Sequence, residues 1–495
     1  MKPDPIKASS QAATGKARKH RNRPSKTQHQ INNQTHPNAG GIDIGAFEIV
    51  VAVPPGRCQE PVRTFNSFTS GLRDLRDWLK DCGVTTVAME STGNYWVNCY
   101  DILEQAGIEV FLVNAGHVKG VPGKKTDVCD AQWLQQLHAA GLLKGSFRPE
   151  QEVLQLRYLV RHRAGMVADA SRLMLHIQKV LTEMNLKLHH VLSDIDGQSA
   201  RDIIRAILAG QRDPEVLAAL CHSRCRASKE EVVAALEGDY RPEYLFVLQD
   251  LHEHLEVVHQ RMGRIDEEIA RQVALLGTTA QASRPEPEEP GEPEEPAKGA
   301  GGGKAKRKAK VKKLGKNAVI LDYQAESERF YGVDLTQIAG VNSGVIVTLM
   351  SEIGPREKLL ESFSSADGFC AWLAVCPNNR ISGGRVLSCR TRKSDNRISA
   401  ALRLAAYGLQ NAKCQMGQYC RRMKGRLGKA EGITATAHKL ARILYSMIRS
   451  GRPYDEKEAF KPNPGVERKR QKSLKSLAQK MGFQLVPIQQ PAVSE

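Results

Sequence analysis

The sequence lacks any apolar run near the roughly eighteen residues that a membrane-spanning helix needs. The basic N-terminus continues into the polar string SKTQHQINNQTH, without the apolar segment of a secretory signal. Acidic residues are also in short supply, because 72 Lys and Arg face only 54 Asp and Glu in 495 residues, a net charge of +18. These shortages make a membrane a less favoured binding partner than a polyanion. They favour a polyanion, and nucleic acid is the leading candidate.

Closely spaced cysteines are absent over most of the sequence. Eleven cysteines are spread singly, which suits reduced thiols in a cytoplasm better than a disulfide framework. The one tight pair, Cys221 and Cys225 with His222 between them, lacks a second ligand pair at zinc-finger spacing. We interpret both as structural thiols.

Four carboxylates in the first third of the chain stand where a metal-dependent nuclease would place them. Asp43 lies in the apolar string GIDIG, and Glu90 ends the apolar string TTVAME before the turn-prone STGN. Asp127 and Asp130 are three residues apart at the start of a helical run, so both project from its first turn. Four carboxylates suit Mg²⁺, or Mn²⁺ in its place, with positions left open for phosphate oxygens. Any one of these acids alone would be a surface residue; the strand, strand and helix context favours a shared site.

The stretch around these acids alternates strand-like and helix-like patterns. Three strand-like segments come first, and a helix, a strand, a helix, a strand and a helix follow. This is the element order of an α/β RNase H-like fold, an analogy of topology rather than a proof. The expected organisation is a disordered basic arm over 1–37, this catalytic domain over 38–148, a helical coiled-coil region over 149–280, a low-complexity linker over 281–316, a mostly α domain over 317–460 and a basic tail over 461–495.

The helical middle carries two heptad series. Apolar residues recur every seven positions from Leu159 to Val180 and again from Leu248 to Leu276. Two such series predict either an antiparallel hairpin or a dimerising coiled coil. A helix pair that packs only within its own subunit accounts for the pattern equally well.

The C-terminal part contains two informative strings. LTQIAGVNSGVIVTLMSEIG resembles a helix-hairpin-helix element that offers backbone N–H groups to phosphates, although a glycine-turned helix pair in a core gives the same pattern. The second string holds Ser382 in a Ser-Gly-Gly turn, with two glycines that allow a phosphate to approach closely. Cations around it can stabilise the charge of a phosphoryl-transfer transition state, which makes an otherwise ordinary loop serine a candidate nucleophile. These expected nucleic-acid-binding residues are Arg380, Arg385, Arg390, Arg392 and Lys393.

The chain resembles the DEDD-motif transposases of bacterial insertion sequences, recombinases with a RuvC-like N-terminal domain and a serine-bearing C-terminal domain. The resemblance covers about 38–280 and 318–490 and rests on GIDIG, MESTGNYW, GHVKGVPGKKTDVCDAQWLQQLHAAGLLKGSFRP, CPNNRISGGRVLSCRTRK and GITATAHKLARILYSMIRSGRPY. It implies that Asp43, Glu90, Asp127 and Asp130 are the metal-binding set and that Ser382 is the nucleophile. It also implies donor and target DNA as substrates, a structured non-coding guide RNA that bridges them, a homo-oligomer, and a place near the bacterial nucleoid.

The sequence departs from the family pattern after the basic run. Lys393-Ser394-Asp395-Asn396 replaces the usual Lys-Gly-Asn turn and is one residue longer. Three readings remain open: a recombinase that acts through a covalent phosphoserine, a RuvC-like junction nuclease that hydrolyses with metals alone, and a non-catalytic nucleic-acid-binding protein.

Overall fold

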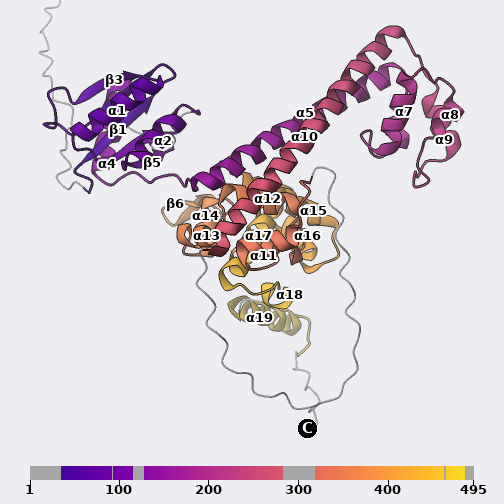
Figure 1. Ribbon diagram of the computed structural model, residues 1–495. Coiled ribbons are helices and arrows are strands. Elements are labelled where there is room, and N and C mark those ends of the chain that lie inside the picture. The colour runs from indigo at the N-terminus through magenta and orange to yellow at the C-terminus, as the bar shows by residue number, and fades with distance from the viewer. Residues whose placement is uncertain (1–34, 92, 115–126, 283–317, 462–463, 485–495) are drawn as a thin grey trace, which may run out of the picture. The chain divides into compact units, whose positions relative to one another are not determined.

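The computed structural model describes residues 35–91, 93–114, 127–282, 318–461 and 464–484 (Figure 1). The expected basic arm and low-complexity linker therefore lie almost wholly outside the described residues. The chain divides into two compact units, Met1–Arg148 and Pro149–Glu495, and each is described by itself. Among the described helices, none is long and apolar enough to cross a membrane.

The first unit is a mixed α/β domain. Its described elements are β1 (Ala39–Ile44), β2 (Glu48–Ala52), β3 (Val62–Asn66), α1 (Thr69–Asp81), β4 (Thr86–Glu90), α2 (Trp96–Gln105), β5 (Glu109–Val113) and α4 (Asp127–Ala139). The sheet has the order β3-β2-β1-β4-β5, with β1, β4 and β5 parallel and β2 antiparallel to both of its neighbours. The predicted order of strands and helices is confirmed, and the topology is consistent with an RNase H-like fold.

Helices cover both faces of this sheet. Leu75 and Leu79 of α1 and Leu103 of α2 pack in one buried cluster with Ile42 of β1 and Met89 of β4. Side chains alternate between the faces of a strand, so the neighbours of Ile42 and Met89 face the other way. On that opposite face α4 packs against the sheet, with Ala131 among its buried contacts.

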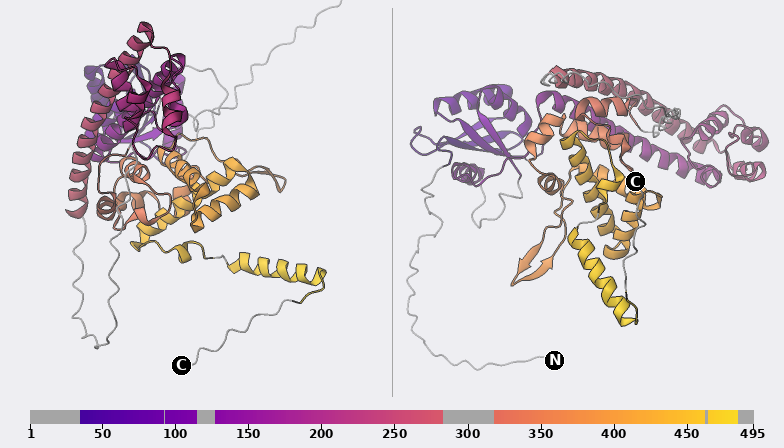
Figure 2. Two further views of the ribbon diagram at one scale, coloured as in Figure 1. Left: turned by 90° about the vertical axis from the view of Figure 1, so that its right-hand side faces the viewer. Right: turned by 90° about the horizontal axis from the view of Figure 1, so that it is seen from below.

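The second unit begins with two long helices that lie side by side in every view (Figures 1 and 2). They are α5 (Gln151–Glu183) and α10 (Pro242–Ala282), and they are joined by α6 (Leu188–Val191), α7 (Gln198–Leu208), α8 (Pro214–Ala218) and α9 (Lys229–Leu236). The Arg163 guanidinium of α5 holds the Asp266 carboxylate of α10, with Nη2 and Oδ2 2.9 Å apart. Further along α5, Met174 lines the same pocket as Leu255, which comes earlier in α10 than Asp266. The two helices therefore run antiparallel.

Both heptad series face the interior of this helix pair, which we call the arm. From Ala170 onward the first series is buried, and Leu248, Leu255 and Met262 of the second series lie in the same core. The pattern is thus accounted for within one chain, and a dimerising coiled coil stays a prediction.

The rest of the second unit is mostly helical. Its elements are α11 (Tyr323–Tyr331), η1 (Leu335–Gln337), α12 (Ser343–Glu352), α13 (Arg356–Ser362), α14 (Ala366–Trp372), β6 (Arg380–Ser382), β7 (Arg385–Ser388), α15 (Arg397–Gly408), η2 (Leu409–Asn411), α16 (Gln415–Leu427), α17 (Lys429–Ser450), α18 (Glu456–Ala459) and α19 (Pro464–Lys480). The expected helix-hairpin-helix element is not confirmed, because the first segment of its string forms only the short 3₁₀ turn η1. The region expected only as a basic tail contains the helix α19.

Candidate functional site

Asp43 and Glu90 lie next to one another at the ends of two parallel strands. The register pairs Ile42 with Met89, so Asp43 and Glu90 are the next residues on strands about 4.8 Å apart. Because side chains alternate along a strand, both point to the face that α4 covers. Each is half-buried, and each takes part in further interactions.

Gly41 determines how closely α4 approaches this edge. A Cβ atom on Gly41 would lie 2.2 Å from the Ala131 carbonyl oxygen and 2.3 Å from the Gln135 backbone nitrogen. The backbone of α4 therefore rests directly on β1, an approach that only glycine permits. Asp43 is two residues further along the same face of β1.

Two polar side chains fix the direction of α4. Gln135 Nε2 donates to the Ala39 carbonyl at 3.2 Å, and His138 Nε2 lies 2.9 Å from Thr86 Oγ1. Ala39 and Thr86 begin their strands, so the C-terminal part of α4 lies where β1 and β4 start. The helix runs antiparallel to both strands, and its N-terminus lies at the end that carries Asp43.

Sequence reasoning missed Gln135 and His138 as positioning residues. Their signal was their spacing from Ala131 and Leu134, which puts them on the buried face of α4. His138 is 1% exposed, and burial, with a smaller contribution from His36, lowers the pKa of its imidazole to about 4. The ring is therefore neutral at physiological pH.

The four predicted metal ligands come from the same end of the first unit. The structure describes the side chains of three of them. Asp127 is the first residue of α4, and its side chain lies outside the described residues. Asp130 is half-buried in the first turn. Among the described side chains, no three or more His, Cys, Asp or Glu lie close enough together to hold one ion. The pair Cys221 and Cys225 belongs to no such group either, and all eleven cysteines are free thiols.

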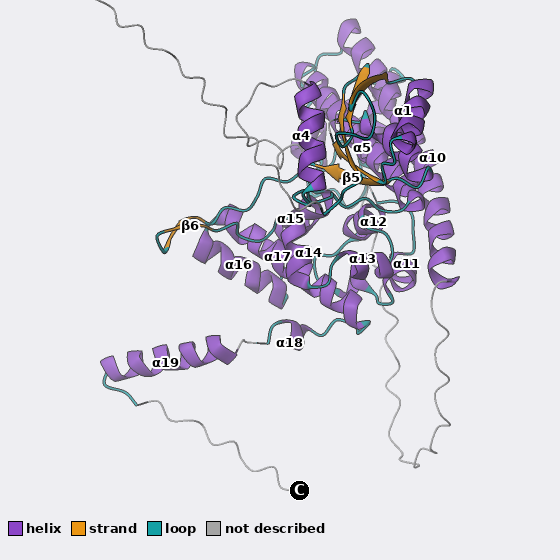
Figure 3. Cartoon of the chain, turned by 90° about the vertical axis from the view of Figure 1, so that its left-hand side faces the viewer, coloured by secondary structure: helices purple, strands orange, loops and turns teal. Residues whose placement is uncertain are grey.

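Ser382 lies in the second unit, at the tip of the β6–β7 hairpin (Figure 3). Ser382 pairs with Arg385 across the turn, and Gly383 and Gly384 have φ angles of 53° and 75°. Positive φ at both central residues is the hallmark of a type I′ turn, which glycine adopts without strain. The serine is exposed, and so are the apolar side chains of Ile381 and Val386 beside it.

The five predicted cations all lie on the exposed hairpin and the segment that follows it. Arg392 is anchored, because its Nη2 donates to the Ala371 carbonyl at the end of α14, 2.5 Å away. The base of the hairpin is closed by the Asn378 amide, which donates to the Arg390 carbonyl at 3.1 Å. The lengthened turn retains a structural role, since Asn396 Oδ1 accepts from the Ser399 amide at 3.0 Å and caps α15.

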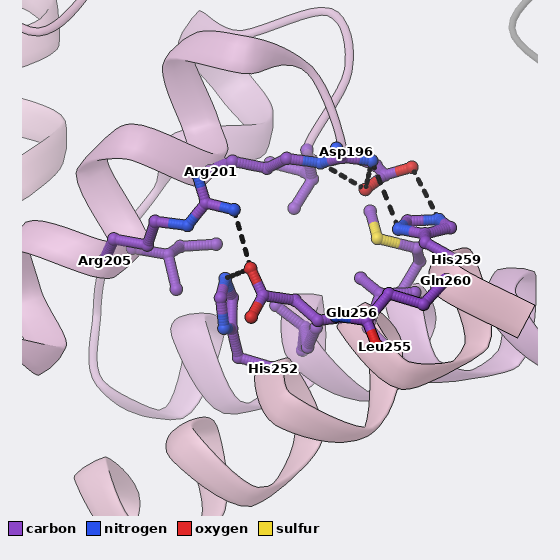
Figure 4. Close-up of a pocket in the computed structure, with 12 residues that line it drawn as sticks. Asp196, Arg201, Arg205, His252, Leu255, Glu256, His259 and Gln260 are labelled. Carbon is purple, nitrogen blue, oxygen red and sulfur yellow. Dashed lines mark hydrogen bonds and ion pairs between the residues drawn. The ribbon is translucent and has the colours of Figure 1, made fainter. Parts of the chain in front are cut away.

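A separate pocket of about 260 Å³ lies on the arm, between α5, α7 and α10 (Figure 4). Its two carboxylates already have cationic partners: Arg201 Nε donates to Asp196 at 2.9 Å, and Arg205 Nη2 donates to Glu256 at 2.6 Å. Burial lowers the pKa of His252 beside them. The contact between Arg205 and Glu256 ties α7 to α10, and we interpret the pocket as part of that structural joint.

Two family models match separate parts of the chain, and the first match continues past Arg148 through α5. Residues 40–186, which contain Asp43, Glu90, Asp127 and Asp130, match a family model for the DEDD transposase of IS110, described as transposase. Residues 334–421, which contain Ser382, match a model described as the transposase IS116/IS110/IS902 family. No curated protein matches the chain.

Proposed function

Because the chain belongs to the IS110 family of transposases, we propose that it cuts and rejoins DNA through a covalent bond to Ser382. The observation that carries the proposal is the setting of this serine. Its hydroxyl is exposed on a turn whose two glycines add no side-chain bulk, with Arg380 and Arg385 on either side. A phosphodiester can therefore reach Ser382 in direct contact with positive charge.

The chemistry that we propose conserves the energy of the broken bond. Ser382 Oγ attacks phosphorus and forms an O–P bond, the bond from phosphorus to the 3′ oxygen breaks, and the serine proton passes to the departing oxygen. Attack by another 3′ hydroxyl on the phosphoserine then rejoins DNA and restores the serine. No external energy source is consumed. Arg385, Arg390, Arg392 and Lys393 neutralise the charge that develops on the phosphate.

We also propose that Asp43, Glu90, Asp127 and Asp130 hold Mg²⁺ or Mn²⁺. Their carboxylate oxygens are the ligands that these hard cations prefer, and the antiparallel course of α4 supports a common location for them. A bound ion would supply positive charge to the phosphate oxygens. The protein's own contribution is to orient the carboxylates, through the strand ends and the Gly41 contact.

We propose a structured RNA encoded by the element as the source of sequence specificity, and an oligomer near the nucleoid as the working form. The net charge of +18 supports a nucleic-acid partner, and strand exchange requires more than one active site. A guide RNA should bind far more tightly than an unrelated RNA of equal length at physiological salt. Equal affinity for the two would argue against a guide.

The decisive experiment traps the protein–DNA adduct. Ser382→Ala should bind nucleic acid normally yet form no covalent adduct and no recombinant product. Ser388→Ala, on the same hairpin, is the matched control and should form the adduct. Mass spectrometry that locates the phosphate on another residue would exclude Ser382 as the nucleophile.

A second variant separates the remaining readings. Asp127→Asn should abolish cleavage while nucleic-acid binding is nearly unchanged, because only the metal set is altered. Metal-dependent nicking by Ser382→Ala would instead favour a junction nuclease. Absence of cleavage and adduct in the wild-type protein with its RNA, DNA and Mg²⁺ would favour a non-catalytic binding protein.

A further inference from the structure

Three arginines surround the single carboxylate of Glu352, at the end of α12. Arg161 of α5 makes two bonds to it, from Nε to Oε1 at 2.9 Å and from Nη2 to Oε2 at 2.8 Å. Arg157 Nε lies 3.2 Å from Oε2, and Arg397 Nε, at the start of α15, lies 4.0 Å from Oε1. Glu352 thus joins the arm to α12 and α15. These two helices belong to the serine-bearing part, by which we mean the portion of the second unit that follows the arm and contains Ser382.

The charges of this cluster do not balance. Glu352 is the only carboxylate within ion-pair distance of Arg161 or Arg397 in the parts of the chain that the structure describes. Arg161 and Arg397 share this one carboxylate, so their two guanidinium groups and Glu352 carry a net charge of +1, and Coulomb repulsion between the cations is stronger near the protein interior than in water. A second anion at this point would relieve the repulsion.

The three arginines differ in what they can reach. The side chain of Arg157 is 15% exposed, and its Nη2 donates to the Glu352 carbonyl at 2.6 Å, so it serves the end of α12. Arg161 and Arg397 are 44% and 49% exposed. Nearly half of each side chain is open to solvent while Glu352 restrains it, so little side-chain freedom is lost when these arginines bind a ligand.

We propose that Arg161 and Arg397 bind one phosphate group of a nucleic-acid strand and that Glu352 holds them in position for it. Guanidinium groups recognise phosphate oxygens through paired hydrogen bonds. The N-terminus of α15, which begins at Arg397, adds partial positive charge. A nucleic acid is favoured over a free phosphate because Arg397 continues the basic run from Arg390 to Lys393. The inference rests on the proposed function for its ligand.

This phosphate would connect two parts of the second unit. Arg161 belongs to the arm, and Arg397 begins the helix that follows the Ser382 hairpin. Binding at this point would therefore strengthen the joint between the arm and the serine-bearing part, to which Glu352, the packing of α12 on α5 and the hydrogen bond from Arg329 of α11 to the Val273 carbonyl of α10 also contribute.

The test measures how the affinity of the full-length protein depends on salt, with single-stranded RNA and duplex DNA of equal length as separate probes. Loss of one phosphate contact lowers the slope of log K against log salt by about 0.9 for duplex DNA or about 0.7 for a single strand. Arg161→Gln and Arg397→Gln should each show this loss with one probe or both, and the probe affected identifies the strand. Arg172→Gln, on α5 and paired with Asp169 at 3.2 Å, is the control and should keep the wild-type slope.

An unchanged slope with both probes overturns the proposal, even if affinity falls at every salt concentration. If Arg161→Gln does not fold, Arg397→Gln alone is measured. Arg397 makes the longer contact with Glu352, 4.0 Å against 2.8 Å, so its loss should disturb the fold less. A failure of Ser382 to form an adduct leaves this measurement intact. Loss of all nucleic-acid binding by the wild-type protein would instead remove the proposed function.

Glu352→Gln provides an independent readout. Without the carboxylate, the guanidinium groups repel one another, so the variant should melt at a lower temperature than the wild type. A bound phosphate would relieve that repulsion, and nucleic acid should raise its melting temperature by more than it raises that of the wild type. Equal increases would mean that Glu352 only ties the helices together.

Discussion

At the scale of single residues, Gly41 sets the separation of α4 from the sheet. The Ala131 carbonyl and the Gln135 amide occupy the space that a side chain at this position would need. The backbone of α4 can fill that space, and bring the acids of α4 toward Asp43, only because residue 41 has no side chain. A residue with no side chain therefore acts on the candidate metal site without touching it.

We expect Gly41→Ala to push α4 away from β1. Such overpacking costs about 1–3 kcal/mol, and cleavage should fall while nucleic-acid binding persists. Gly40→Ala is the matched control, because its Cβ would meet the Val87 side chain at 3.1 Å rather than backbone. Denaturant unfolding and a cleavage assay check both. Equal effects of the two substitutions would contradict the role assigned to Gly41.

His138 predicts how the first unit responds to acid. Its pKa is about 4 in the folded chain, below the usual 6.5, so the unfolded chain binds more protons between these values. Stability from this group is complete above pH 6.5 and is lost as the pH falls toward 4. The full shift corresponds to about 3 kcal/mol.

Hydrogen exchange of β1, β4 and α4 at pH 7 and pH 4.5 measures this loss. His138→Gln, which keeps a polar group but does not titrate, should lower stability at pH 7 and reduce the dependence on pH. A variant with the same dependence as the wild type would assign it to other groups.

At the scale of elements, the β6–β7 hairpin is a small sheet of its own. Two strands alone are marginally stable in water, and this hairpin exposes apolar as well as charged side chains. The turn therefore contributes much of its order, through the two positive φ angles.

We expect Gly383→Val to abolish adduct formation with little change in melting temperature, because a β-branched residue is strained at a φ of 53° and the hairpin lies outside the core. Gly383→Asn should retain activity, since asparagine is favoured in this type of turn. The adduct assay applied to both variants checks the prediction. An inactive asparagine variant would mean that more than backbone conformation is required.

Local sequence patterns predicted most of the helices and strands. Apolar runs gave β1 and β4, and heptads gave α5 and α10, because the period of a buried face is written in neighbouring residues. Contacts between distant segments left no such mark. Glu352 lies 191 residues from Arg161 and meets it only after folding, and the first half of the expected helix-hairpin-helix was too short to form a helix of its own.

For the candidate site too, the sequence predicted the local features but not the contacts between distant segments. The residue types and the strand ends indicated Asp43 and Glu90 as neighbours, and their register in the sheet agrees with that expectation. The approach of α4 depends on a backbone contact at Gly41, which no periodicity reveals.

At the scale of the whole molecule, the two predicted halves of the chemistry belong to different compact units. The carboxylates lie in Met1–Arg148, and Ser382 lies in Pro149–Glu495. A protein built in this way can bind nucleic acid with one unit while the other is not yet engaged. We therefore propose that the complete site forms only on assembly, which would limit stray cutting by the free chain.

The arm also has a fixed length. A helix of 41 residues is about 60 Å long, and its antiparallel partner keeps it straight, so the tip with α7, α8 and α9 stands at a fixed distance from the helices at its base. Removing one heptad from each helix, 166–172 and 257–263, would shorten that distance by about 10 Å and rotate the tip by only about 20°. If the tip measures the spacing between bound segments, this variant should prefer a correspondingly shorter spacing. Removing four residues from each helix would turn the tip by about 40° and should impair every spacing alike.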